Sequence, residues 1–96
     1  MSAYIVVDCE VTDPAKYDQY KQLAPAAIAQ YGGRYLARGG TAAVLEGNWQ
    51  PGRVVILEFP SLAAAKAFYD SPEYGAARAV RAGAATMNLV AIEGVS

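Results

Sequence analysis

The sequence predicts an α+β domain in which a four-stranded antiparallel sheet carries helices on one face, in the element order β-α-β-β-α-β. Segments with the alternation and branched side chains of strands are interleaved with segments whose apolar residues recur every three or four positions. Glycine pairs and proline-containing turns mark the boundaries. At 96 residues the chain is expected to form one domain, residues 1–96.

The first two elements are a strand and a helix. Residues 3–11 alternate and are rich in branched side chains, which is typical of a strand. Asp13 and Pro14 then begin a helix as its N-cap and first residue. Pro25 lacks an amide hydrogen, so it predicts a kink or two abutting helices. The pair Gly32-Gly33 ends the helical region.

The middle of the chain predicts two further strands. Residues 34–38 form a short strand between two glycine pairs, and Gly39-Gly40 predicts a bulge or bend before the strand resumes at residues 41–45. A glycine-rich loop follows at residues 46–52. The third strand, residues 53–59, has a continuous apolar centre, which is typical of a central strand covered on both faces.

The last part of the chain predicts helical structure followed by a strand. Ser61 is the expected N-cap of one helix. Ser71 repeats this signal before a proline and an acidic residue, so a second helical piece is expected at about residues 72–82. Residues 86–93 are the final strand.

The composition excludes several classes of function. Eight basic and nine acidic residues nearly cancel, which argues against a nucleic-acid partner, and no apolar run reaches the ~20 residues of a membrane span. Without histidine, serine–histidine catalysis and histidine-bound zinc or haem are excluded, so we expect no metal site and no cofactor. A single cysteine, Cys9, and an N-terminus unlike a signal peptide predict a cytoplasmic protein.

The face of the sheet opposite the helices is expected to be partly apolar. If the strands alternate regularly, this face carries Val6, Leu36, Ile56 and Val90. Apolar area of this extent is rarely left in water. A second copy of the chain, related by a two-fold axis, is the simplest cover, so we expect a homodimer.

The same alternation gathers charged side chains on that face, and two interpretations fit them. In the first interpretation, they pair with one another and fix the register of the dimer. Alternatively they form a pocket in which an arginine holds an anionic or enolic substrate and a carboxylate moves a proton. The candidate catalytic residues are then Asp8, Arg38 and Glu58. The candidate ligand-binding residues are Tyr4, Glu10, Arg34, Arg38, Trp49 and Glu58.

Trp49, the only tryptophan, is expected on the glycine-rich loop. It is either a lid or stacking wall for an aromatic ligand, or an anchor that packs the loop onto its own or a second subunit.

Several segments resemble the domain-of-unknown-function 1330 family. The most specific are the glycine-bracketed arginine segment at residues 32–40 and Glu-Phe-Pro-Ser at residues 58–61. The full set is residues 12–14, 31–40, 46–47, 53–61, 71–74 and 93–94. The resemblance implies membership of the dimeric α/β barrel superfamily, in which two ferredoxin-like sheets face each other in a homodimer. It implies a cavity between sheet and helices or between the sheets, but no agreed activity.

Together these observations predict a small cytoplasmic homodimer that binds a small anionic or aromatic molecule in a pocket on the sheet face. Two alternatives remain open. The first is a cofactor-free enzyme of the monooxygenase, isomerase or dehydratase type, since the resemblance extends to a superfamily with such members. The second is a dimer with a purely structural role.

Overall fold

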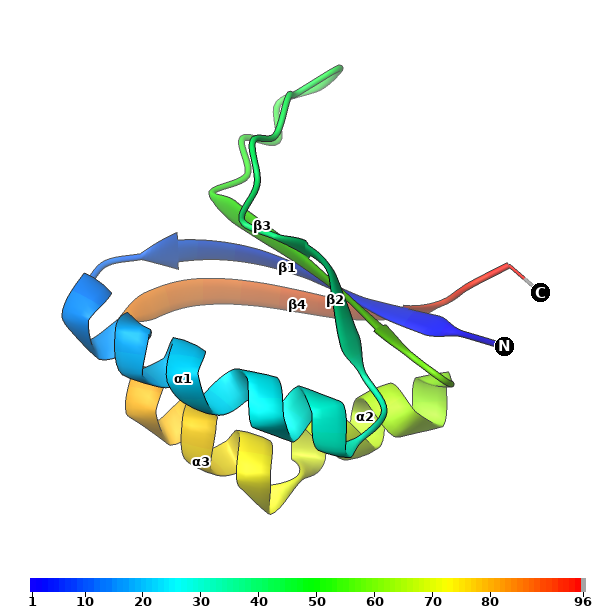
Figure 1. Cartoon of the computed structure of the whole chain (residues 1–96). Coiled ribbons are helices and arrows are strands. Elements are labelled where there is room, and N and C mark those ends of the chain that lie inside the picture. The colour runs from blue at the N-terminus through cyan, green and yellow to red at the C-terminus, as the bar shows by residue number, and fades with distance from the viewer. Residues whose placement is uncertain (96) are drawn as a thin grey trace.

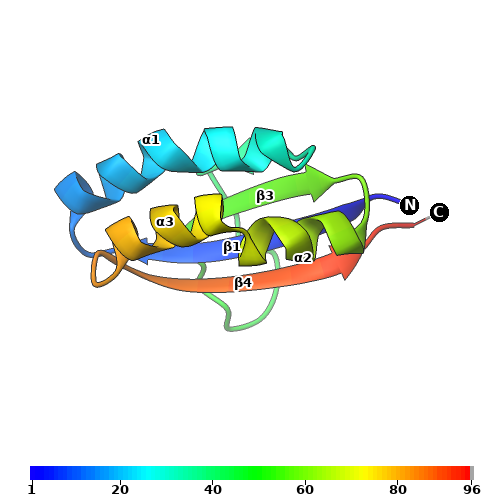
Figure 2. The ribbon, with the colours of Figure 1, turned by 90° about the horizontal axis from the view of Figure 1, so that it is seen from below.

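The computed structural model of the chain describes residues 1–95, which form a four-stranded sheet and three helices in the order β-α-β-β-α-α-β. The strands lie in the order β2-β3-β1-β4, and every neighbouring pair is antiparallel. The helices pack on one face of the sheet (Figures 1 and 2). The predicted architecture is therefore confirmed. The elements are β1 (Ala3–Val11), α1 (Pro14–Gln30), β2 (Arg34–Arg38), β3 (Arg53–Phe59), α2 (Leu62–Asp70), α3 (Pro72–Arg81) and β4 (Ala85–Glu93).

The hydrophobic core lies between the sheet and the helices. Alternate residues of β1 and β3 are buried there, among them Ile5, Leu57 and Phe59. Aromatic rings from the helices complete the core, with the Phe68 and Tyr74 ring centroids 4.3 Å apart. Such pairs add to the stability that burial alone provides. None of the helices in residues 1–95 is long and apolar enough to cross a bilayer.

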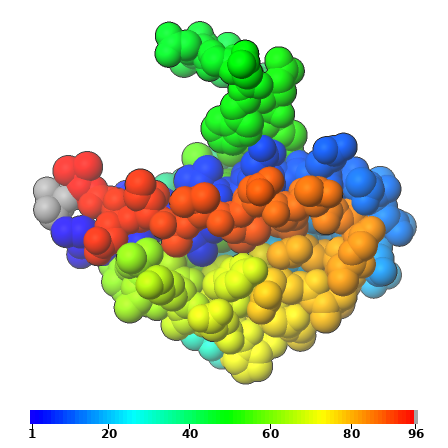
Figure 3. All heavy atoms as spheres, turned by 180° about the vertical axis from the view of Figure 1, so that it is seen from behind, coloured from blue at the N-terminus to red at the C-terminus, as the bar shows by residue number. Residues whose placement is uncertain are grey.

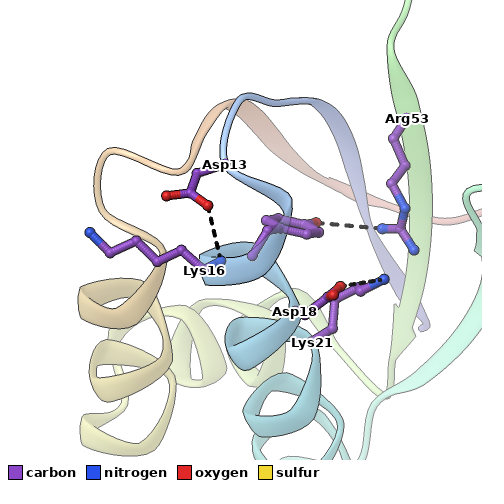
Figure 4. Close-up of polar contacts among 6 residues, drawn as sticks. Asp13, Lys16, Asp18, Lys21 and Arg53 are labelled. Carbon is purple, nitrogen blue, oxygen red and sulfur yellow. Dashed lines mark hydrogen bonds and ion pairs between the residues drawn. The ribbon is translucent and has the colours of Figure 1, made fainter.

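The start of α1 follows from its first residues. The backbone N–H of Lys16 donates to Asp13 Oδ1 at 3.2 Å, which satisfies one of the free amides of the first turn (Figure 4). The helix then continues through Pro25, so the alternative of two abutting helices is excluded. On its inner side Tyr17 is buried, and Arg53 Nη1 from β3 donates to the Tyr17 hydroxyl at 3.5 Å.

One buried serine joins α2 to α3. The Ser71 hydroxyl donates to the Phe68 carbonyl at 2.6 Å and accepts from the Tyr74 backbone N–H at 3.1 Å. The same side chain therefore ends one helix and caps the next, which turns the chain while leaving its backbone groups paired.

The predicted strand at residues 41–45 is wrong. Residues 39–52, called the arm below, contain no strand or helix and extend from the sheet on its helix-free side (Figures 1 and 3). The Gly39 N–H donates to the Val54 carbonyl at 2.8 Å, and Gly39 has a φ of 72°, which directs the chain away from β3. Beyond this point, residues 41–45 have no strand beside them in the part of the chain that the structure describes.

Candidate functional site

The helix-free side of the sheet, called the open face below, consists of cross-strand rows. The central row is apolar, because Val6 lies opposite Ile56 on one side and opposite Val90 on the other. The row toward the start of β1 is mainly polar: Arg34, Glu58, Tyr4 and Ile92. The row on the other side holds Val54, Asp8 and Asn88. The open face is thus part apolar and part charged, as predicted.

Arg34 and Glu58 form an ion pair across neighbouring strands. Arg34 Nε donates to Glu58 Oε1 at 2.7 Å, and the two residues are directly opposite in the β2–β3 register. The Glu58 side chain is 21% exposed, whereas that of Arg34 is 70% exposed. Each group already has a partner of opposite charge, so neither is a free binding group for an ion in this arrangement.

Asp8 holds the base of the arm. Trp49 Nε1 donates to Asp8 Oδ2 at 2.8 Å, and the Gly52 backbone N–H donates to Asp8 Oδ1 at 2.9 Å. Both carboxylate oxygens are therefore engaged by residues more than forty positions away in the sequence. Asp8 and Trp49 are both candidate residues from the sequence, but their contact was not predicted, because nothing local in the sequence links them.

The prediction that Arg38 shares the open face with Arg34 is wrong. The β-bulge lies between Tyr35 and Ala37 instead of at Gly39-Gly40, so Arg38 is opposite Val55, which is buried against the helices. The extra residue reverses the facing of the strand's end. The Arg38 guanidinium lies 4.4 Å from the centroid of the Tyr35 ring, a cation–π arrangement.

Arg38 lines a cavity of about 30 Å³ between sheet and helices. Its wall also includes Tyr20 and Tyr74, whose hydroxyls are 2.7 Å apart. Burial raises the pKa of Tyr20, so this phenol keeps its proton at neutral pH. A space of this size holds about one water molecule, which is too little for a substrate.

The two remaining candidates on β1 are separated. Tyr4 is directly opposite Glu58, so it lies beside the Arg34–Glu58 pair. Glu10 is exposed near the far end of the strand, opposite Thr86. The structure therefore brings Arg34, Glu58 and Tyr4 together, and Asp8 and Trp49 together, but it leaves Glu10 and Arg38 apart from both groups.

A depression of about 220 Å³ lies on the open face at the base of the arm. Val6 and Val90 contribute apolar surface, and Trp49 contributes an aromatic side chain that is 60% exposed. Asn88 and Asp8 add polar groups. An apolar surface with a few convergent polar groups is the usual character of a small-molecule site.

A larger groove of about 410 Å³ lies on the other side of the sheet, between α2 and β4. It is called the α2–β4 groove below. Its lining is mostly apolar, with Lys66 and Asp70 as its charged members. The full lining is Ile5, Ala65, Lys66, Tyr69, Asp70, Met87, Leu89 and Ala91. Within residues 1–95, no three cysteine, aspartate or glutamate side chains gather closely enough to hold a metal ion.

Comparison with known proteins shows both a family and a fold. The sequence profile of a family described as domain of unknown function (DUF1330) matches residues 2–95. Among curated proteins, no significant match was found.

Three solved structures illustrate the likeness. A protein of unknown function from Rhodopseudomonas palustris has a TM-score of 0.77 at 19% identity, covering 99% of this chain and 83% of that one. A dimeric ferredoxin-like protein of unknown function from Thermobifida fusca has a TM-score of 0.64 at 22% identity, covering 98% and 92%. A cofactor-independent oxygenase from Streptomyces nogalater has a TM-score of 0.65 at 11% identity, covering 99% and 94%. The fold is therefore ferredoxin-like.

Proposed function

The chain belongs to the DUF1330 family, and we propose that it binds a small aromatic molecule in a pocket on the open face that a second copy of the chain closes. The observation that carries this proposal is the depression of about 220 Å³ beside Trp49. In one chain it is open to water, and a facing sheet would enclose it.

The homodimer in this proposal is supported by the apolar surface of the open face. Val90 is 62% exposed and Ile92 is 56% exposed, although both lie in a strand of the sheet. Contiguous exposed apolar surface usually marks an interaction site. Proteins of the same fold from Thermobifida fusca and Jannaschia are described as dimeric. A two-fold arrangement would place the same face on both copies.

The charges on the open face favour a neutral aromatic ligand over an anion. Arg34 is already bonded to Glu58, and Arg38 lies on the helix side. The carboxylate of Asp8 lines the depression and would repel an anion. Trp49 offers a ring on which an aromatic ligand can stack.

A matched pair of ligands tests the proposal. In a ¹⁵N-labelled protein, Trp49 gives the single indole N–H resonance, so its shift reports directly on the depression. We expect 2-naphthol to move this resonance saturably, and 2-naphthoate to bind at least about tenfold more weakly because of the charge. Absence of a saturable shift with any neutral ring compound would refute the proposal.

Two variants of β4 locate the site. Val90→Phe fills the depression and should weaken 2-naphthol binding, whereas Ile92→Phe, on the same face but outside the lining, should leave it unchanged. Both variants stay apolar, so both preserve the surface expected to face the second copy. Equal effects of the two would place the ligand elsewhere.

A cofactor-free enzyme is the second candidate. Asp8 favours it, because this carboxylate lies in the wall of the depression, and each of its oxygens, which already accepts one hydrogen bond, has a further lone pair that can take a substrate proton. The fold also occurs in the cofactor-independent oxygenase from Streptomyces nogalater. Oxygen uptake or product formation with a bound ring compound, lost in Asp8→Asn while that variant still binds 2-naphthol, would support this candidate, because retained binding shows that the arm is still in place. If the protein binds a ring compound without turning it over, it is a binding protein. If it shows neither binding nor turnover, the purely structural dimer is the remaining alternative.

A cytoplasmic location is part of the same proposal. It is supported by the thiol of Cys9, which is free and buried and so needs no oxidising compartment.

A further inference from the structure

The arm contains a segment with strand-like side chains that has no neighbouring strand among residues 1–95. Residues 41–45 have the small and branched apolar side chains that predict a strand, yet in the described residues they pair with nothing. At the tip, Leu45 is 94% exposed and Val44 is 50% exposed. A segment with these properties is suited to pairing with an open sheet edge of another chain.

The base of the arm is fixed, which directs its tip away from the body. Asp8 accepts hydrogen bonds from Trp49 and Gly52 on one leg, and the Gly39 N–H donates to Val54 on the other. Figures 1 and 3 show the arm standing off the open face, on the side opposite the helices. Its direction is therefore set before any partner arrives, which lowers the ordering cost of binding.

The length of the arm decides where the tip ends. Each leg of the arm, residues 39–52, can span roughly 20 Å when extended, whereas stacked sheets lie only ~10 Å apart. If two open faces are opposed, the arm of one copy is therefore long enough to reach the other sheet and to lie along one of its edges. From such an edge its tip can also reach the side chains on the helix side of that sheet.

Of the two edge strands, β4 is better suited than β2 to pair with residues 41–45 of another copy. β4 is nine residues long and ends the sheet, so its outer side has no strand beside it in the described residues. The other edge, β2, has five residues and a bulge, features that disfavour edge pairing. The α2–β4 groove lies directly beside β4 and offers apolar side chains, among them Met87 and Leu89.

The charges of the tip and the groove are complementary. Glu46 is the only charged residue of the arm and follows Leu45 directly. Lys66 lies at the groove, and no ion pair is found for either side chain within residues 1–95. Asp70, one turn further along α2, also lies at the groove, so the fit requires Glu46 to approach the Lys66 end.

We propose that residues 41–45 of each copy pair with the outer edge of β4 in the other copy, with Leu45 in the α2–β4 groove and Glu46 beside Lys66 of the partner subunit. The proposal rests on the homodimer of the proposed function. The two exchanged arms hold the open faces together. Each arm also carries Trp49, which lines the depression on the open face, so closure of this pocket depends on pairing of the arm with β4 of the partner subunit.

A directed crosslink tests this contact in the intact chain. Leu45→Cys and Lys66→Cys are made separately, with Cys9 left in place because it is buried. The two variants are unfolded and refolded together, then mildly oxidised. We expect a disulfide-linked dimer in the mixture and none with either variant alone. Leu23→Cys, another exposed leucine, is the matched control and should give no product with Lys66→Cys.

Other positions of the arm would give other results. A product from Leu45→Cys alone would mean that two arm tips meet each other, and that overturns the proposal. If the groove binds the small molecule instead, 2-naphthol would shift the Met87 and Leu89 methyl resonances and no mixed disulfide would form, which also overturns it.

Charge reversal supplies an independent measurement that needs no cysteine. Glu46→Lys and Lys66→Glu should each weaken the dimer, raising its dissociation constant by about tenfold, and the double variant should return it to within about threefold of the original. If the parent protein and all three charge variants have equal dissociation constants and no crosslink forms, the arm contact is refuted. If the protein is still a dimer and still binds 2-naphthol, the proposed function stands without that contact. A monomer at all concentrations would remove both proposals.

Discussion

Gly52 is where the arm rejoins the sheet and touches β1. A Cβ atom at this position would lie 2.5 Å from the Cys9 carbonyl oxygen, which is too close for two non-bonded atoms. Because this oxygen belongs to the backbone, only a shift of the backbone can separate the two atoms. Gly52→Ala should therefore lower the free energy of unfolding by roughly 1–3 kcal/mol. Thermal unfolding followed by circular dichroism measures this change.

Gly40 is the matched control, because a Cβ atom there meets nothing within 4 Å. Gly40→Ala should change the melting temperature little or raise it slightly, since alanine restricts the unfolded chain. A loss of stability at Gly40 equal to that at Gly52 would show that the contact with β1 is not the cause.

Tyr17 makes the stability of the fold sensitive to alkaline pH. Burial, together with the neighbouring Cys9 thiol, raises the pKa of Tyr17 to about 12 against the opposing effect of Arg53. The unfolded phenol titrates near pH 10, so the folded state holds this proton more tightly. Its contribution to stability is complete below about pH 10 and is lost as the pH rises toward 12.

Urea unfolding between about pH 8 and pH 11 tests this expectation. The free energy of unfolding should stay level to about pH 10 and then decline, and Tyr17→Phe should decline less steeply. An unchanged free energy across this range in the parent protein would contradict the effect of Tyr17 burial.

The predictions for single residues were correct where strand alternation alone determines on which face of the sheet a side chain lies. Tyr4, Asp8 and Glu58 lie in the open-face rows because β1 and β3 pair without irregularity. Arg38 was misplaced because one extra residue in β2 reverses the facing, and no nearby sequence signal marks where a bulge will form. Whether the candidate residues act in binding or catalysis stays a prediction.

Among the elements, α1 is notable for a proline in its interior. Pro25 cannot donate to the Lys21 carbonyl, and its ring crowds the preceding turn. Pro25→Ala should therefore raise the free energy of unfolding by about 1–2 kcal/mol. The gain in helix stability is partly offset, because the unfolded chain has more conformational entropy without the proline. Pro14→Ala, at the first helical position, should have little effect.

The melting temperatures of these two proline variants provide the measurement. A lower melting temperature for Pro25→Ala would indicate that the ring makes packing contacts that outweigh the missing hydrogen bond. This outcome would contradict the expected gain.

Element boundaries were largely predictable because caps and periodicity are local. The bounds of β1 and β3 agree with the predicted residues, and Ser71 and Pro72 begin α3 as expected. Residues 41–45 fail for a non-local reason: their side chains suit a strand, but a strand also needs a neighbour, and residues 1–95 supply none. The same reasoning makes that segment the natural candidate for pairing between copies.

At the scale of the molecule, the chain measures 35 × 33 × 17 Å and consists of one layer of helices and one sheet, with the arm standing off the open face (Figure 1). A chain of this size buries only about 60–65% of the surface that its unfolded form exposes, so its core is small. The open face holds further apolar area that one chain leaves in water, including Val90 and Ile92. Covering it adds buried surface without lengthening the chain.

The molar mass in dilute solution, measured by multi-angle light scattering, tests most directly whether a second copy covers the open face. We expect a dimer of about 20 kDa, twice the 10.1 kDa of one chain, that persists on dilution to the low micromolar range. A constant mass of 10.1 kDa would contradict it, because the open face and the arm would then be exposed to water in the functional protein.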